Sequence, residues 1–184
     1  MLFRSESDAG AVIKLALEFV ILTACRTSEV LGARWTEVDL DTATWTIPGA
    51  RMKRGKEHRV PLAPRCIEIL SAAKEFGGEY VFPGRKPDVP LSNMAFLMVL
   101  RRMGVEATVH GFRSSFRDWT SEETNTPREV AEQALSHAIG NAVEAAYRRG
   151  DLLEKREKLM QGWAAFCRQI GHPANVISLA RAKG

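Results

Sequence analysis

The chain has 184 residues, of which 45% are apolar, and its formal net charge is +4. This length and composition predict one packed domain and argue against an intrinsically disordered chain. A membrane span is not expected, because the longest apolar run, residues 11–25, is interrupted by Lys14 and Glu18 and is too short to cross a bilayer.

The first residues and the cysteines favour a cytoplasmic protein. The start of the chain carries mixed charges rather than the basic and apolar regions of a secretory signal. The cysteines are odd in number and far apart, which is typical of buried or free thiols in a reducing compartment: Cys25, Cys66 and Cys167. We therefore expect a cytoplasmic protein with no membrane partner.

Positive charge is concentrated in one short stretch. Six basic or imidazole side chains fall within nine positions: Arg51, Lys53, Arg54, Lys56, His58 and Arg59. Smaller arginine pairs occur at 101–102 and 148–149. The pattern fits a polyanionic partner, but a charge run is commonly just a solvated surface. Charge alone therefore does not distinguish nucleic-acid binding from an ordinary exposed face.

The first part of the chain predicts two helices and then a small sheet. Residues 11–24 form an apolar helix, and Thr27 can cap a short helix over 28–35. Three short segments have the composition of antiparallel strands: 38–40, 44–47 and 59–62. The basic stretch 51–58 then forms one tip of this meander.

The rest of the chain is expected to be helical. Pro64 begins a helix that Gly77 ends, and Ser92 begins another that ends before Gly104. A helix follows at 110–122, and a capping box at 126–129 opens the next, which runs to about 137. Asn141 can cap a further segment, and Asp151 with Glu154 opens the last helix. The predicted fold class is α+β, mainly α-helical, with a small three-stranded antiparallel sheet.

Three of the polar residues have the chemistry of a phosphate site. His110 and Arg113 are spaced i and i+3, so both can point from one helix face into one site. Arg26 lies at the break between two predicted helices. Two guanidinium groups can pair with one phosphate and neutralise its charge as a new bond forms. Taken singly, each arginine could equally be a surface ion pair, and His110 a core histidine.

Five motifs, taken together and in this order, resemble those of the tyrosine recombinases, the phage integrase family. They are Ala-Cys-Arg26-Thr-Ser-Glu29 with a following Arg-Trp35, Met52-Lys53 with His58-Arg-Val-Pro-Leu62, Val109-His110-Gly-Phe-Arg113, Ala134-Leu-Ser-His137, and Tyr147 ten positions after His137. The resemblance covers about residues 11–170, and the segment after Tyr147 is similar to the prophage and satellite-phage branch. It implies the fold of the DNA breaking-rejoining enzymes.

The resemblance also implies a reaction and its nucleophile. Tyr147 would attack the scissile phosphate and form a 3′-phosphotyrosine, with no ATP, metal or other cofactor. Arg26 and Arg113 would clamp the phosphate, and His137 would donate a further hydrogen bond to it. The other tyrosine, Tyr80, lies in an apolar segment and is expected to serve packing.

Roles for the remaining site residues follow from the same motifs. His110 would act as general base or position the tyrosine. Lys53 would protonate the leaving 5′-oxygen, with Lys56 as the competing candidate. Glu29 would orient Arg26. The alternative is that Glu29 stabilises the start of the helix, where a carboxylate interacts favourably with the helix dipole. Ser136 departs from the family pattern, because a glycine usually precedes this histidine.

The expected partners are double-stranded DNA and, for a full-length integrase, other protomers in a tetrameric synapse. The residues expected to contact DNA are Arg51, Arg54, Lys56, Arg59 and Arg148. We expect residues 1–170 to be a catalytic domain without the arm-binding and core-binding domains, monomeric alone and weak in DNA affinity. Residues 171–184 form a tail that could contact a neighbouring protomer.

Three alternatives to an active recombinase have less support in the sequence. A catalytically inactive DNA-binding relic is disfavoured by the complete set of candidate catalytic residues. A type IB topoisomerase, which uses similar chemistry, is disfavoured by the prophage-like segment after Tyr147. A metal-dependent hydrolase finds little support, because the histidines and cysteines lack metal-ligand spacing.

Overall fold

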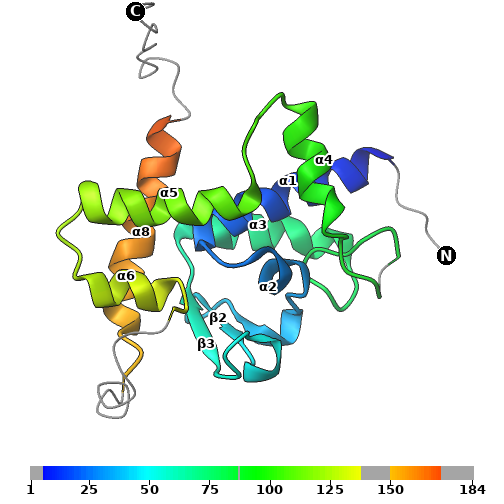
Figure 1. Cartoon of the computed structure of the whole chain (residues 1–184). Helices are drawn as coiled ribbons and strands as arrows, with labels where there is room; N and C mark the ends of the chain where they lie inside the picture. Colours follow the sequence, from blue (N-terminus) through cyan, green and yellow to red (C-terminus); the bar gives the residue numbers. More distant parts are fainter. Residues whose placement is uncertain (1–5, 87, 138–149, 171–184) are drawn as a thin grey trace, which may run out of the picture.

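The fold is mainly helical, with one small sheet, which confirms the predicted class (Figure 1). The computed structural model describes residues 6–86, 88–137 and 150–170. In chain order the elements are α1 (Glu6–Thr23), α2 (Thr27–Leu31), η1 (Trp35–Glu37), β1 (Val38–Asp39), β2 (Thr44–Ile47), η2 (Gly49–Arg51), β3 (His58–Pro61), α3 (Pro64–Ala73), η3 (Lys74–Phe76), α4 (Met94–Arg102), α5 (Val109–Glu122), α6 (Arg128–Ala134) and α8 (Leu153–Ile170). No helix in these described ranges is long and apolar enough to cross a membrane.

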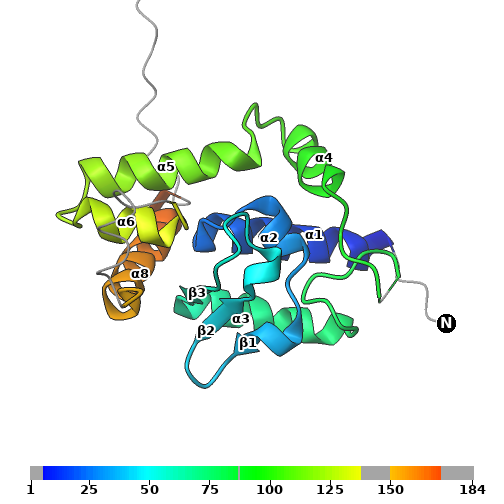
Figure 2. The same cartoon turned by 60° about the horizontal axis from the view of Figure 1, so that its bottom comes forward.

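The three strands form an antiparallel meander in the order β1-β2-β3, as predicted (Figure 2). In the register, Trp45 pairs with Val60, and Ile47 pairs with His58. Trp45 and Ile47 are fully buried, whereas the alternating Thr44 and Thr46 are half-buried, so one face of the sheet packs on the core. The hairpin between β2 and β3 carries the basic stretch.

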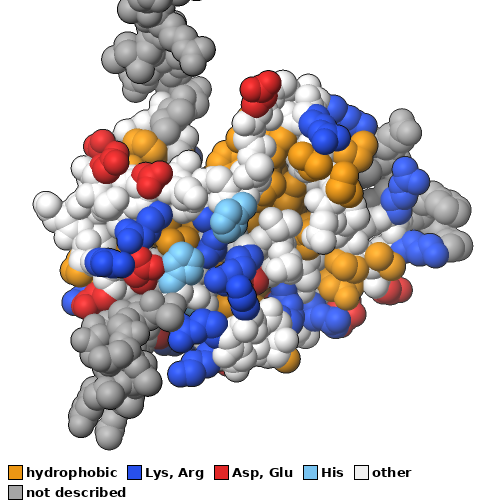
Figure 3. All heavy atoms as spheres, in the orientation of Figure 1, with side chains coloured by type: hydrophobic (Ala, Val, Ile, Leu, Met, Phe, Trp, Pro, Cys, Tyr) orange, Lys and Arg blue, Asp and Glu red, His pale blue; other side chains and the backbone are white. Residues whose placement is uncertain are grey.

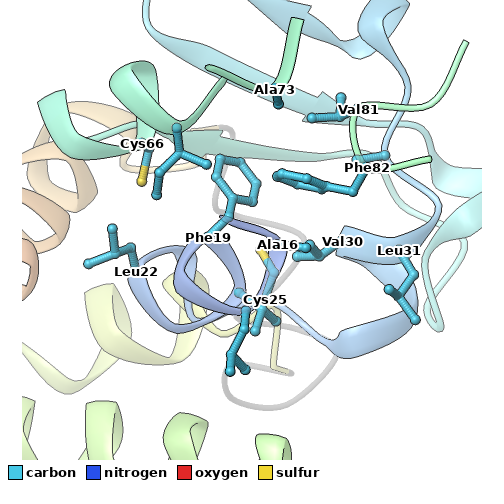
Figure 4. Close-up of a cluster of buried hydrophobic side chains, with 14 of the residues drawn as sticks. Ala16, Phe19, Leu22, Cys25, Val30, Leu31, Cys66, Ala73, Val81 and Phe82 are labelled. Atoms are coloured by element: carbon cyan, nitrogen blue, oxygen red, sulfur yellow. The ribbon is translucent and has the colours of Figure 1, made fainter. Parts of the chain in front are cut away.

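The main core surrounds α1. The ring of Phe19 lies 5.6 Å from that of Trp45, which joins α1 to the sheet. It lies 5.4 Å from the ring of Phe82, which belongs to the segment after α3 (Figure 4). Cys25 and Cys66 are buried in this core as free thiols, in line with the expectation from their spacing. Burial raises the pKa of each thiol to about 12, so both stay protonated.

A second, aromatic cluster joins α5, α6 and α8. The ring of Trp163 lies 5.5 Å from Phe116 and 5.3 Å from Trp119. Its Nε1 also donates a hydrogen bond to the Ile21 carbonyl at 2.9 Å, which connects α8 to α1. The apolar stripe of the last helix is therefore largely core. Figures 1 and 2 show α6 and α8 lying beside α5.

Several helix ends differ from those predicted. Arg26, not Thr27, is the residue before α2, and the helix ends at Leu31. The predicted capping box at 126–129 is wrong, because Pro127 precedes α6 and no side chain caps that helix. Helix α4 begins at Met94, two residues after the predicted start. Local sequence specifies where helices occur better than it specifies their terminal hydrogen bonds.

Helix α6 ends earlier than predicted because of Ser136. This residue has φ of 51°, in the left-handed region, and the helix stops at Ala134 instead of about residue 137. A side chain with a Cβ is unfavourable in that conformation, by about 1–2 kcal/mol. The backbone itself thus explains why glycine is the usual residue at this position of the motif.

Replacing Ser136 with glycine should stabilise the chain. The variant loses the Cβ strain but gains freedom in the unfolded state, so we expect a net gain of roughly 0.5 kcal/mol. Urea denaturation followed by circular dichroism measures the difference. Ser136→Ala is the matched control, because it removes the hydroxyl and keeps the Cβ. If the glycine variant is no more stable than the alanine variant, the strain argument fails.

Candidate active site

Arg26 is held at the turn between α1 and α2. The chain leaves α1 through Ala24, whose φ is 50°, and Arg26 then precedes α2. The carboxylate of Glu29 accepts a hydrogen bond from the Arg26 backbone N–H at 2.7 Å and from its Nη1 at 2.8 Å. Glu29 is 2% exposed. At the start of α2, one carboxylate thus contacts both the backbone N–H and the guanidinium of Arg26.

Arg113 projects from α5 into the interior. It is buried, and its guanidinium donates to the Ala24 carbonyl and, at 2.8 Å, to the Leu135 carbonyl. Burial lowers the pKa of this guanidinium, and the nearby charge of Arg26 acts in the same direction. The Glu29 carboxylate balances one of these two positive charges, so the group keeps a net positive charge that attracts an anion.

One cavity of about 350 Å³ brings three of the predicted site residues together. Arg26 lines it from the start of α2, and His110 and Arg113 line it from α5, as the i, i+3 spacing predicts. Thr108 positions the start of α5, because its side chain accepts a hydrogen bond from the Gly111 N–H at 3.1 Å. Figure 3 shows histidine side chains among Lys and Arg side chains on this face of the molecule.

His137 lies beside this cavity, just after the turn at Ser136. Its Nε2 is 3.4 Å from Arg113 Nη2, and its Nδ1 is 2.8 Å from Glu132 Oε2. The side chain is 43% exposed. Three parts of the chain that are distant in the sequence therefore contribute to one site: Arg26, His110 with Arg113, and His137.

The predicted lysines lie on the turn of the β2–β3 hairpin. Gly49 must be a glycine, because a Cβ there would lie 2.5 Å from the Gly55 carbonyl oxygen. Lys53 and Lys56 are both exposed on the turn. The neighbouring Arg54 donates from Nη1 to the His137 carbonyl at 2.9 Å. This contact brings the tip of the hairpin to the end of α6.

Not every cation of the basic stretch faces solvent. Arg51 forms an ion pair with Glu37 and donates to the Glu29 carbonyl, and its side chain is only 20% exposed. Arg59 forms a two-pronged ion pair with Asp151, at 2.8 and 2.9 Å. Both guanidinium groups are thus paired within the protein, so a DNA contact by either arginine would compete with its ion pair.

His58 also belongs to the interior. It is 8% exposed and hydrogen-bonded to the backbone of Ala134. Burial, and secondarily the charge of Arg156, lower the pKa of His58 to about 4, so the imidazole is neutral at physiological pH. It connects β3 to α6 and contributes no charge to the basic stretch.

Sequence reasoning missed three residues that build the site: Glu132, Asp151 as an ion-pair partner, and Arg156. Arg156 is 1% exposed and donates to the backbone carbonyls of Asp151 at 2.7 Å and of Arg59 at 2.6 Å. A signal for it was present, because Arg156 falls on the apolar stripe of the last helix. An arginine on such a stripe must find internal partners.

Two predicted residues, Tyr147 and Arg148, lie outside the described residues. Contacts are nevertheless defined on both sides of the range 138–149. Arg54 contacts the His137 carbonyl before it, and Arg59 and Arg156 contact Asp151 after it. Burial raises the pKa of the Asp151 carboxyl, but the hydrogen bond from Arg59 and the charge of Arg156 outweigh this and hold it below its ordinary value.

Within the described ranges, no group of three or more His, Cys, Asp or Glu side chains could hold a metal ion. The cavity is lined by two guanidinium groups and an imidazole. Two cations facing one small cavity, with imidazoles beside them, can bind a phosphodiester and exchange protons with it.

Comparison with known proteins first defines the class. The fold matches that of the integrase from mycobacterium phage Brujita with a TM-score of 0.62 at 19% identity, over 86% of this chain and 52% of that one. The chain therefore shares the fold of that integrase.

The sequence then defines the family. Residues 2–152 match the Phage integrase family. The prophage integrase IntA of Escherichia coli (strain K12) is 40% identical over 78% of this chain and 36% of that protein. The prophage integrase IntZ of the same strain is 35% identical over 88% of this chain and 41% of that protein. The chain belongs to the phage integrase family, and it spans about two fifths of the length of these relatives.

Proposed function

We propose that residues 1–170 act as the catalytic domain of a tyrosine-type site-specific recombinase, which integrates DNA through a covalent phosphotyrosine. The observation that carries this proposal is the single cavity lined by Arg26, His110 and Arg113, with His137 beside it. Membership of a family that includes prophage integrases supports the same reaction.

In the proposed reaction Tyr147 forms the covalent bond. Its hydroxyl oxygen attacks the scissile phosphorus, and the bond from phosphorus to the 5′-oxygen breaks. The phenolic proton leaves to His110, and a proton from Lys53 completes the departing 5′-hydroxyl. A second 5′-hydroxyl then reverses both steps on another strand. The number of phosphoester bonds is unchanged, so the exchange needs no external energy source.

The arginines serve this reaction because they are held before the substrate arrives. Arg113 is fixed by two backbone carbonyls, and Arg26 by the Glu29 carboxylate. Preorganised donors stabilise the additional negative charge of the transition state without a cost of reorientation. Removing one arginine of this kind from a phosphoryl-transfer site costs roughly a thousandfold in rate or more.

The proposed partners are double-stranded DNA and other protomers. A lambda integrase tetramer bound to a Holliday junction has the same fold, with a TM-score of 0.55 at 21% identity over 71% of this chain and 42% of that one. Arg54, Lys56 and Arg148 are proposed to contact DNA phosphates directly, and Arg51 and Arg59 to do so on release of their ion pairs. Residues 171–184 are proposed to contact a neighbouring protomer. We further propose that this domain works in the cytoplasm and is monomeric without DNA.

Substituting Tyr147 tests the nucleophile. The chain is incubated with a pool of nicked DNA duplexes of randomised sequence. After cleavage, the short fragment that carries the 5′-hydroxyl diffuses away, so religation cannot occur and the covalent adduct accumulates. We expect a covalent protein–DNA product that survives denaturing electrophoresis and is lost in Tyr147→Phe. The substitution removes only the hydroxyl, so folding is preserved.

Mass mapping assigns the trapped residue. DNA joined to Tyr147 supports the proposal, and DNA joined to any other residue, or an adduct that persists in the phenylalanine variant, contradicts it. Binding without any adduct would instead identify an inactive DNA-binding relic.

A sulfur leaving group distinguishes Lys53 from Lys56. A general acid contributes about 10²–10⁴-fold when oxygen leaves, but a 5′-thiolate leaves without protonation. We expect Lys53→Ala to slow adduct formation on ordinary DNA and to recover on DNA with sulfur at the bridging 5′ position. Lys56→Ala is the matched control from the same turn and should show no such recovery. Recovery of Lys56→Ala instead would assign the acid to Lys56.

A further inference from the structure

The carboxylate of Glu132 lies behind His137. It projects from α6, and its side chain is 13% exposed. One oxygen, Oε2, lies 2.8 Å from His137 Nδ1, and the other, Oε1, lies 2.8 Å from Arg117 Nη2. The exposed Arg128 is more distant, at 3.8 Å. Each carboxylate oxygen thus has its own partner, one of them a histidine of the candidate site.

We propose that Glu132 is a positioning residue, which fixes the tautomer and the direction of the His137 ring so that Nε2 faces the reacting phosphate. This inference rests on the proposed function, because it assigns His137 to the phosphate site. Glu132 itself does not touch substrate, and its effect is exerted through the imidazole.

The tautomer follows from the acceptor chemistry of a carboxylate. An ionised carboxylate only accepts hydrogen bonds, so the hydrogen between Glu132 and His137 is on Nδ1. Nε2 is then the ring atom that faces Arg113. In the neutral ring Nε2 accepts a hydrogen bond, and in the cation it donates one to a phosphate oxygen. Which nitrogen meets the substrate is set by the bond at the opposite nitrogen.

The backbone reinforces the side-chain contact. The His137 N–H donates to the Glu132 carbonyl at 2.9 Å, across the left-handed turn at Ser136. His137 is therefore connected to Glu132 by main chain and side chain together. A ring held at two points keeps its orientation while it is 43% exposed.

The charges around His137 show why a carboxylate is needed there. Arg113 and Arg117 face this region from α5, Arg128 from α6, and Arg54 from the hairpin, where it donates to the His137 carbonyl. Among the described residues, Glu132 is the acidic group in contact with the ring. Without it, the imidazolium form would meet only cations. Arg117 in turn holds the carboxylate in place.

Nitrogen-15 NMR of the histidine rings tests the geometry directly and without DNA. At a pH where His137 is neutral, we expect its hydrogen on Nδ1 in the unmodified chain and in Glu132→Gln, whose amide oxygen still accepts. In Glu132→Ala the Nε2–H form should increase. Arg128→Ala is the matched control on the same helix face and should leave the tautomer unchanged. A hydrogen on Nε2 in the unmodified chain would overturn the proposal.

The rate of adduct formation on the nicked duplex pool tests whether this geometry matters for the reaction. We expect Glu132→Ala to slow the adduct by roughly ten- to a hundredfold, as for carboxylates that orient catalytic histidines elsewhere, with partial recovery in Glu132→Gln and no effect in Arg128→Ala. An unchanged rate in folded Glu132→Ala, checked by circular dichroism, would overturn the proposal. If the unmodified chain forms no adduct while the tautomer is as expected, the proposed function fails and the geometric assignment stands.

Discussion

The burial of one guanidinium group organises this site. Arg113 enters the interior from α5 and donates to the carbonyls of Ala24 and Leu135, which belong to two turns far apart in the chain. The first turn presents Arg26, and the second presents His137. A buried arginine without such acceptors would cost several kcal/mol, so the fold that satisfies Arg113 also assembles the residues around the cavity.

A second set of contacts connects the β2–β3 hairpin to the same region. His58, Arg54 and Arg59 of one short stretch contact the end of α6, the His137 carbonyl and Asp151 respectively. Buried Arg156 adds a contact from α8 back to β3. The hairpin that carries Lys53 is thereby coupled to both sides of the range that contains Tyr147. In the proposed reaction Tyr147 attacks the phosphorus and Lys53 protonates the 5′-oxygen that leaves on the opposite side, so their relative placement matters.

Local patterns were sufficient for the fold class, the three strands and the pairing of His110 with Arg113 on one helix face. They were insufficient where the outcome depends on partners distant in sequence. Arg51 and Lys53 look equivalent in a basic run, yet Arg51 faces Glu37 and Lys53 faces solvent. The capping box expected at 126–129 does not form. No sequence pattern marked Glu132, because its partner His137 is brought near it by the left-handed backbone at Ser136, a position where glycine is usual.

The most direct measurement is the position of a bound tetrahedral oxyanion in crystals of this chain. Tungstate resembles a phosphate group and is located by its anomalous scattering. The account predicts one tungstate in the cavity, within hydrogen-bond distance of the guanidinium groups of both Arg26 and Arg113. Tungstate bound only elsewhere, or held by one of these arginines while the other faces a separate surface, would contradict it.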